Sequence, residues 1–140
     1  LLRKKFFVKA LQKNNIRIND NLFLDVFHDQ KKSKARIKDF ITKNNEVTVL
    51  LVSSHTFATY AIDACRELNR EIGREISLIS FDADVLSTFS PHITTISQPV
   101  DDVTKYLVKL IDSKIKSIGR NYRFLYKPKL IEKKSVSNIT

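Results

Sequence analysis

The chain has 140 residues, a formal charge of +10 and a single cysteine, Cys65. This length suits one domain with its own core, and one cysteine excludes an internal disulfide. The lack of an 18-residue apolar run excludes a membrane span, and with only two glycines the sequence also excludes the glycine-rich nucleotide-binding turns. We therefore expect a cytoplasmic protein whose basic residues, spread over most predicted helices, form a solvated surface.

Apolar periodicity predicts an alternation of helices and strands along the chain. The predicted elements are, in order, a helix at 1–14, a strand at 22–27, a helix at 31–44, a strand at 47–52, a helix at 56–73, strands at 76–81 and 92–98, a helix from 100 to about 118 and a strand at 122–131. Because the strands are apolar almost throughout, we expect them to be covered on both faces. The pattern predicts an α/β fold with a doubly wound parallel sheet.

Two predicted helices carry more specific expectations. In the helix at 1–14, Leu2, Phe6 and Ala10 recur every four residues and predict one buried face. The helix at 56–73 has a core stripe that Phe57, Tyr60 and Ala64 widen beyond the width of one sheet face. A second contact surface, in a symmetric homodimer, is the natural use for this excess.

Glycine and proline mark several expected boundaries. Gly73 suits the C-terminal cap of the helix at 56–73, and Gly119 suits the end of the helix that starts at Val100. Pro128 places the last strand near an edge or a bend of the sheet. Cys65 lies on the apolar side of its predicted helix and is expected to be a reduced core residue.

Polar side chains follow or end four of the predicted strands. They are His28, Ser53, Asp82 and Gln98, and Arg3 lies in the first turn of a predicted helix. In a parallel sheet the carboxyl ends of the strands meet at one edge, beside the N-termini of the helices. We therefore expect these five residues to line one mouth at that edge.

These residues do not form a catalytic or metal-binding set. Ser54 and His55 are adjacent, and adjacent residues rarely reach the geometry of a nucleophile and its base. His28, His55 and His92 lack the spacing of a zinc site. An arginine, an aspartate, a glutamine and a hydroxyl supply instead the fixed donors and acceptors that a polyhydroxyl ligand needs. We expect a binding module without enzyme activity, metal or cofactor.

One block of the sequence resembles the effector-binding domain of LacI/GalR-type (lac-repressor-type) transcription regulators, which is similar to periplasmic sugar-binding proteins. In that family a strand ends in Gly-aromatic-Asp-Asp, and a loop, a Pro, a Leu-Thr-Thr-Val-like strand and Gln-Pro follow. This chain has Ser80-Phe81-Asp82-Ala83 and then Pro91-His92-Ile93-Thr94-Thr95-Ile96-Ser97-Gln98-Pro99. The similarity extends over nearly the whole chain and implies the C-terminal half of a domain of the periplasmic binding protein type I class.

The resemblance implies roles for individual residues. Arg3 matches the arginine that grips the effector, Asp82 the acid that pairs with ligand hydroxyls, and Gln98 a polar contact from the other lobe. Ser53 replaces the Asn of an Asn-Asp pair, and His28 falls near the position of an aromatic ring that stacks on the ligand. The loss of the Asn-Asp pair leaves the ligand class open.

The resemblance also implies a domain organisation with two lobes around a cleft. Residues 1–82 and 123–133 would form the C-terminal lobe, residues 83–122 would belong to the N-terminal lobe, and residues 134–140 would be a tail. Closure of the cleft on a small effector, a sugar or a phosphorylated sugar, would control a DNA-binding domain absent from these 140 residues, so that operator DNA is contacted only through that domain. The alternative is the solute-binding protein of an ABC transporter.

Overall fold

The computed structural model describes residues 2–82, 93–115 and 124–137. Within these ranges the elements are α1 (Leu2–Lys13), the short 3-10 helix η1 (Asp20–Leu22), α2 (Gln30–Lys43), β1 (Val49–Val52), α3 (His55–Glu67), β2 (Ser77–Phe81), β3 (Thr94–Ser97), α4 (Val100–Ile115) and β4 (Lys129–Ile131). The expected helical stop at Gly119 lies outside the described residues.

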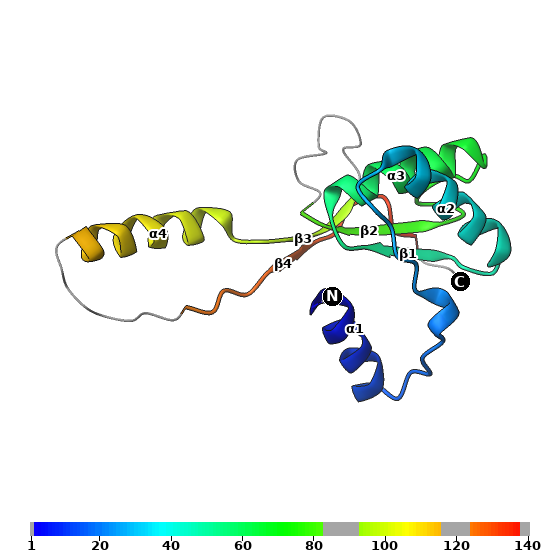
Figure 1. The fold of residues 1–140 in the computed structure, drawn as a ribbon. Coiled ribbons are helices and arrows are strands. Elements are labelled where there is room, and N and C mark those ends of the chain that lie inside the picture. Colours follow the sequence, from blue (N-terminus) through cyan, green and yellow to red (C-terminus); the bar gives the residue numbers. More distant parts are fainter. Residues whose placement is uncertain (1, 83–92, 116–123, 138–140) are drawn as a thin grey trace.

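The four strands form one sheet in the order β1-β2-β3-β4 (Figure 1). β1, β2 and β3 are parallel, and β4 runs antiparallel to β3. Helices α2 and α3 cover one face of this sheet, and α1 lies on the opposite side (Figure 1). The structure confirms the predicted α/β fold with a mainly parallel sheet.

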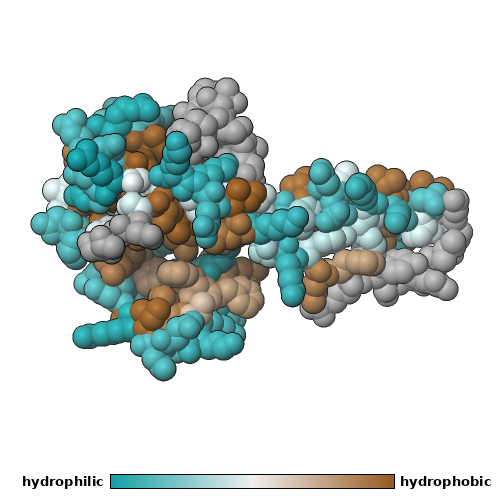
Figure 2. Space-filling model, turned by 180° about the vertical axis from the view of Figure 1, so that it is seen from behind, coloured by the Kyte–Doolittle hydropathy of each residue, from teal (hydrophilic) through white to brown (hydrophobic). Residues whose placement is uncertain are grey.

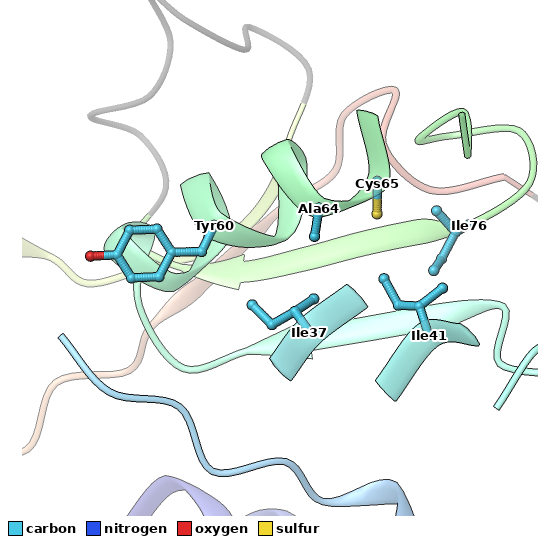
Figure 3. Close-up of a cluster of buried hydrophobic side chains, with 6 residues drawn as sticks. All are labelled: Ile37, Ile41, Tyr60, Ala64, Cys65 and Ile76. Atoms are coloured by element: carbon cyan, nitrogen blue, oxygen red, sulfur yellow. The ribbon is translucent and has the colours of Figure 1, made fainter. Parts of the chain in front are cut away.

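The core lies between the sheet and the two covering helices. Small residues of α3, Ala58 and Ala61, pack against Leu78 of β2 and Ile93 just before β3. Because these alanines have almost no side chain, the helix backbone can approach the strands closely. A second cluster joins α2 to α3 and consists of Ile37, Ile41, Tyr60, Ala64, Cys65 and Ile76 (Figure 3).

This second cluster corrects the expected dimer surface. Ala64 is fully buried and Tyr60 is only 8% exposed, and both pack with Ile37 and Ile41 of α2. The apolar stripe of α3 is wide because α2 and the sheet cover it from two sides. The expectation that Tyr60 and Ala64 contact a second copy is therefore wrong, and Phe57 also packs against this cluster.

Cys65 is buried in the same cluster, as expected. Burial in apolar surroundings raises the pKa of its thiol to about 11, because the thiolate would lose its hydration. The thiol is thus protonated at neutral pH and behaves as a small apolar side chain.

Helix α3 ends earlier than the sequence indicates. Its last residue is Glu67, and Asn69 adopts a left-handed conformation with φ of 53°. The amide of Arg70 donates to the carbonyl of Cys65 and that of Asn69 to the carbonyl of Arg66, which together make a Schellman motif. Asn69 therefore takes the capping position that was expected for Gly73.

Residues 22–27, which were expected to form a strand, do not join the sheet. Leu22 ends η1, and Leu24 and Val26 pack against the core without strand pairing. The side chain of Ser33 accepts a hydrogen bond from the amide of Phe27 and donates to its carbonyl. These side-chain bonds satisfy the backbone that a neighbouring strand would otherwise satisfy.

Helix α1 has the predicted bounds but not the predicted burial. None of its described residues is buried, and Leu2 and Phe6 are 70% and 62% exposed. Across from it, Val49 and Leu51 of β1 remain 47% and 38% exposed, because they point away from α2 and α3. The face of the sheet on the α1 side is only thinly covered.

Residues 133–137 cross the sheet near the amino ends of β2 and β3. The hydroxyl of Ser135, which is 1% exposed, accepts a hydrogen bond from the amide of Thr94 and donates to the carbonyl of Leu78. The hydroxyl of Thr94 bonds both backbone groups of Lys133. Buried polar groups are thus paired across the two strands, and this segment ties them together.

Helix α4 and the described residues from Phe124 to the start of β4 project from the sheet as an arm (Figure 1). Within the arm the ring of Tyr106 contacts that of Phe124, and the hydroxyl of Tyr126 donates to the carbonyl of Asp102. The predicted strand at 122–131 is shorter than expected: residues 122 and 123 lie outside the described ranges, and pairing is confined to Lys129–Ile131. Apolar side chains are visible along the arm (Figure 2).

Candidate functional site

Three polar residues follow the three parallel strands directly. Ser53 comes after β1, Asp82 after β2 and Gln98 after β3. Because the strands run in the same direction, these residues lie at one edge of the sheet. Ser54, which follows Ser53, is the N-cap of α3, and its side chain accepts a hydrogen bond from the backbone amide of Phe57. The N-terminus of α3 therefore lies at the same edge of the sheet.

Arg3 reaches this edge from the first turn of α1. Its guanidinium donates to the carbonyl of Ser53 and to Oδ2 of Asp82, the second at 3.2 Å. Oδ2 of Asp82 also accepts a hydrogen bond of 2.7 Å from Nε2 of the Gln98 side chain. The side chains of Arg3 and Asp82 are 39% and 31% exposed, so the network is half-buried and open to a ligand.

The backbone of Asp82 turns sharply at the end of β2. Its φ is +56°, a left-handed conformation that aspartate and asparagine tolerate better than most residues. Its amide donates to the carbonyl of Ile96 in β3 at 3.1 Å. This turn fixes where the carboxylate points, and it leaves that carboxylate between Arg3 and Gln98.

Phe81, the last residue of β2, completes the network. The guanidinium carbon of Arg3 lies 4.3 Å from the centre of the Phe81 ring, a cation–π distance. Phe81 was not predicted as a site residue, although it stands in the Ser80-Phe81-Asp82 motif. Its position in the strand was the signal that could have identified it. Side chains alternate between the two faces of a strand, so the Phe81 ring points to the opposite face from Ser80, which is the face toward α1.

His28 lies beside α3 and not in the Arg3 network. Its carbonyl accepts a hydrogen bond of 3.1 Å from the hydroxyl of Tyr60, and its ring lies 5.8 Å from that of Phe57. The structure therefore brings together Arg3, Ser53, Asp82 and Gln98, and Ser53 takes part through its carbonyl. His28 contacts the first turns of α3, next to the cap at Ser54.

The chemistry of this network favours binding over catalysis. It holds one cation, one carboxylate and one amide, which can donate and accept several hydrogen bonds at fixed positions. Within the described ranges, no group of His, Cys, Asp and Glu side chains has the arrangement of a metal site. No described helix is long and apolar enough to cross a membrane.

Residues 1–136 match the sequence model of one family, described as a periplasmic binding protein-like domain. This match covers nearly the whole chain. The chain belongs to that family. Its strand-end network at Arg3, Asp82 and Gln98 thus lies in a periplasmic binding protein-like domain.

Similar curated proteins include transcription regulators. This periplasmic binding protein-like domain is 29% identical over 134 residues to the HTH-type transcriptional regulator MalR of Clostridium butyricum, with 95% of this chain and 40% of that protein covered. It is 25% identical over 139 residues to the HTH-type transcriptional repressor PurR of Photobacterium profundum, with 98% and 42% covered. The chain therefore spans about two fifths of the length of these curated relatives.

Solved structures agree on the fold. A LacI-family transcriptional regulatory protein from Corynebacterium glutamicum superimposes with a TM-score of 0.79 at 20% identity, covering 96% of this chain and 52% of that one. The relatives, the domain match and this fold confirm the resemblance to the effector-binding domain of LacI/GalR-type regulators. Both of the curated relatives named above are transcription regulators.

An open depression of about 570 Å³ lies elsewhere on the periplasmic binding protein-like domain, between η1 and α2. Its lining includes Asp39 and Lys43, whose charged groups already pair with each other at 2.8 Å. None of its lining residues follows a strand. The strand-end network, and not this depression, is the candidate functional site.

Proposed function

We propose that this domain senses a small polar metabolite, such as a sugar, for a LacI/GalR-type transcriptional repressor. The observation that carries the proposal is the network of Arg3, Asp82 and Gln98 at the carboxyl edge of the sheet. Arg3 and Asp82 are 79 residues apart in sequence. Neither residue belongs to the core, so a binding role accounts for their meeting better than packing does.

The hydrogen-bonding capacity of this network suits hydroxyl groups. A hydroxyl can both donate to the carboxylate of Asp82 and accept from the guanidinium of Arg3. Gln98 adds one further donor and one further acceptor. In the unliganded chain these groups satisfy one another, and a ligand with several hydroxyls would replace those bonds with bonds of its own.

The arm formed by α4 supports a second lobe. β3 pairs with β2 and β4 in one sheet, so the lobe bounds expected from the sequence need revision: β3 would belong to the C-terminal lobe with residues 1–82 and 124–133, and α4, which leaves the sheet after β3, would belong to an N-terminal lobe. Residues 134–137 are bonded to the sheet through Ser135 and are not the expected tail. An effector held between the lobes would favour the closed arrangement and shift the population toward it. This shift would control a helix-turn-helix domain outside these 140 residues, which would contact operator DNA in a homodimer.

The alternative, a solute-binding protein of an ABC transporter, is not favoured. The similar curated proteins are HTH-type regulators, and no observation on this chain points to a transporter. The proposal includes a phosphorylated sugar as a second candidate effector, for which Lys4 or Lys5 beside Arg3 would supply further positive charge.

Calorimetric titration with a panel of neutral and phosphorylated sugars tests the proposal. Asp82→Asn should lower the affinity for the bound sugar by about tenfold or more, because an amide cannot replace a charged hydrogen-bond acceptor. Asparagine tolerates the same left-handed backbone, so the fold should be retained.

The matched control is Asp39→Asn on α2, which removes the same charge from a residue that pairs only with Lys43 among the described ion pairs. It should bind the sugar as tightly as the unchanged chain. The proposal fails if Asp82→Asn binds as well as this control, or if no sugar of the panel binds a folded protein that includes both lobes.

A further inference from the structure

Helix α1 depends on few contacts with the strands. It has no buried residue, and the contacts of Phe7 and Lys4 with the Phe23 ring tie it to the segment that follows it. Arg3 is different, because its guanidinium bonds reach Ser53 and Asp82 beyond the ends of β1 and β2. The position of the Arg3 guanidinium therefore affects both the hydrogen-bond network of the candidate site and the packing of α1 against the sheet.

Hydrogen bonds alone do not fix a long arginine side chain that is 39% exposed. Arginine has many staggered conformers, and water competes for its donors. A guanidinium is, however, planar and weakly hydrated, so it stacks well on an aromatic ring. The Phe81 ring, 4.3 Å from the guanidinium carbon, supplies such a surface directly before Asp82 in the chain.

We propose that Phe81 is a positioning residue, whose ring holds the Arg3 guanidinium at the sheet edge so that its N–H groups stay directed at Asp82 and Ser53. Phe81 at the end of β2 and Asp82 directly after it then have separate roles. Asp82 supplies the charge that Arg3 bonds, and Phe81 supplies the surface that limits where Arg3 can go. Through Arg3, the same ring stabilises the docking of α1.

Hydrogen exchange of the 140-residue chain, without ligand, tests this role. Phe81→Leu removes the ring but keeps an apolar side chain, and it should speed exchange in residues 2–13 about two- to fivefold, the range of an exposed cation–π contact. Phe81→Tyr keeps the ring and should leave exchange in α1 unchanged. Exchange in α2 serves as the reference for an intact fold, since α2 packs on the other face.

A double-mutant cycle separates positioning from simple apolar cover. If Phe81 acts through Arg3, then Phe81→Leu should have no further effect on α1 in an Arg3→Met background. Equal acceleration in both backgrounds would show that the ring only covers the sheet and would overturn the proposal. Acceleration in α2 as large as in α1 would also overturn it.

Arg3→Lys provides a second variant that leaves the core untouched, in case Phe81→Leu does not fold. A lysine ammonium is compact and strongly hydrated and cannot reproduce the stacked, forked geometry, so α1 exchange should again rise about two- to fivefold. Unchanged exchange in Arg3→Lys would contradict the proposed role.

The consequence for effector binding rests on the function proposed above and is measured separately. Sugar affinity should fall in Phe81→Leu and be retained in Phe81→Tyr. Faster α1 exchange in Phe81→Leu, together with no sugar binding by a folded protein that includes both lobes, would overturn the proposed function and leave the positioning role standing. Normal α1 exchange in Phe81→Leu would overturn the positioning role whatever the sugar affinity.

Discussion

Gly73 is required where two segments of the chain approach each other. Its φ is +85°, and a Cβ atom placed on it would lie 2.2 Å from the carbonyl oxygen of Lys134. Both the left-handed backbone and the backbone neighbour exclude a side chain here. This glycine therefore lets residues 133–137 reach the strands, a role unrelated to helix capping.

Gly73→Ala should lower the free energy of unfolding by about 2 kcal/mol, because it adds strain at a positive φ and a clash with backbone that cannot move freely. Urea denaturation measures this loss. Asn69→Gly is the matched control, since it changes a left-handed surface residue in the neighbouring turn and should stay within about 0.5 kcal/mol. A Gly73→Ala chain as stable as this control would show that the segment at Lys134 can shift away.

At the same scale, the sequence predicted that Ser53, Asp82 and Gln98 gather, because the position of a residue at a strand end does not depend on side-chain detail. Arg3 was expected beside them because it lies in the first turn of a helix, and helix N-termini lie at the same edge. Two features could not be predicted in this way. The placement of His28 depends on the packing of the Phe57 and Tyr60 rings, and the stacking of Arg3 on Phe81 depends on side-chain conformers of residues far apart in sequence.

At the scale of elements, α2 and α3 are joined by charge as well as by their apolar cluster. Lys34 and Lys38 of α2 donate to the two carboxylate oxygens of Glu67 at the end of α3, at 2.6 and 2.7 Å. These hydrogen bonds lower the pKa of Glu67 from 4.5 to about 2, that from Lys34 having the largest effect. The hydrogen bond with Glu67 also raises the pKa of Lys34.

The lowered pKa predicts a specific pH dependence. Glu67 has a lower pKa in the folded chain than in the unfolded one, so it stabilises the fold above pH 4.5 and loses this effect as the pH falls toward about 2. Glu67→Gln should thus be less stable than the unchanged chain at neutral pH, with a difference that shrinks to nothing in acid. Urea denaturation across this pH range measures the difference.

Glu46→Gln is the matched control for Glu67→Gln, because it removes the same charge from an exposed residue of a chain with a net charge of +10. If both variants show the same pH dependence, the effect comes from net charge and not from the link between α2 and α3.

Helices and strands were predicted well where the apolar periodicity is strong. They were predicted less well where the structure depends on which distant residues the segment contacts. The bounds of α1 and α2 agree with the sequence because helical spacing is a local property. Residues 22–27 are apolar because Leu24 and Val26 pack on the core, and an apolar run does not reveal whether its backbone pairs with a strand or, as here, with Ser33.

At the scale of the whole molecule, the sheet with α2 and α3 is a packed body, and the arm is not. Ile41 of α2 is 2% exposed, whereas Ile115 at the end of α4 is 76% exposed. Val108 and Ile111 of α4 are also more than half exposed. The stability of this chain should therefore come almost entirely from the packed body.

Two identical substitutions compare the body with the arm. Ile41→Ala should lower the free energy of unfolding by about 2–5 kcal/mol, because it leaves a cavity in the core. Ile115→Ala should change it by less than about 0.5 kcal/mol. Urea denaturation followed by far-ultraviolet circular dichroism measures both, and a comparable loss in the two variants would show that α4 packs against the body in solution.

The sequence predicted the fold class because helix and strand alternation suffices to define it. It did not predict the thin cover on the α1 side of the sheet, because helical periodicity indicates an apolar face without showing what lies against it. The wide stripe of α3 was misinterpreted for the same reason: a neighbouring helix and a second copy produce the same apolar pattern.

The crossing segment at Ser135 also bears on the order of events during synthesis. The ribosome delivers β1, β2 and β3 before residues 133–137, so the amide of Thr94 and the carbonyl of Leu78 await the serine hydroxyl that later pairs with both. Until Ser135 leaves the ribosomal exit tunnel, the Thr94 amide and the Leu78 carbonyl lack the hydrogen bonds that Ser135 makes with them in the folded chain. We expect folding of this chain to finish after translation of Ser135, with chaperones having access to the open strands in the meantime.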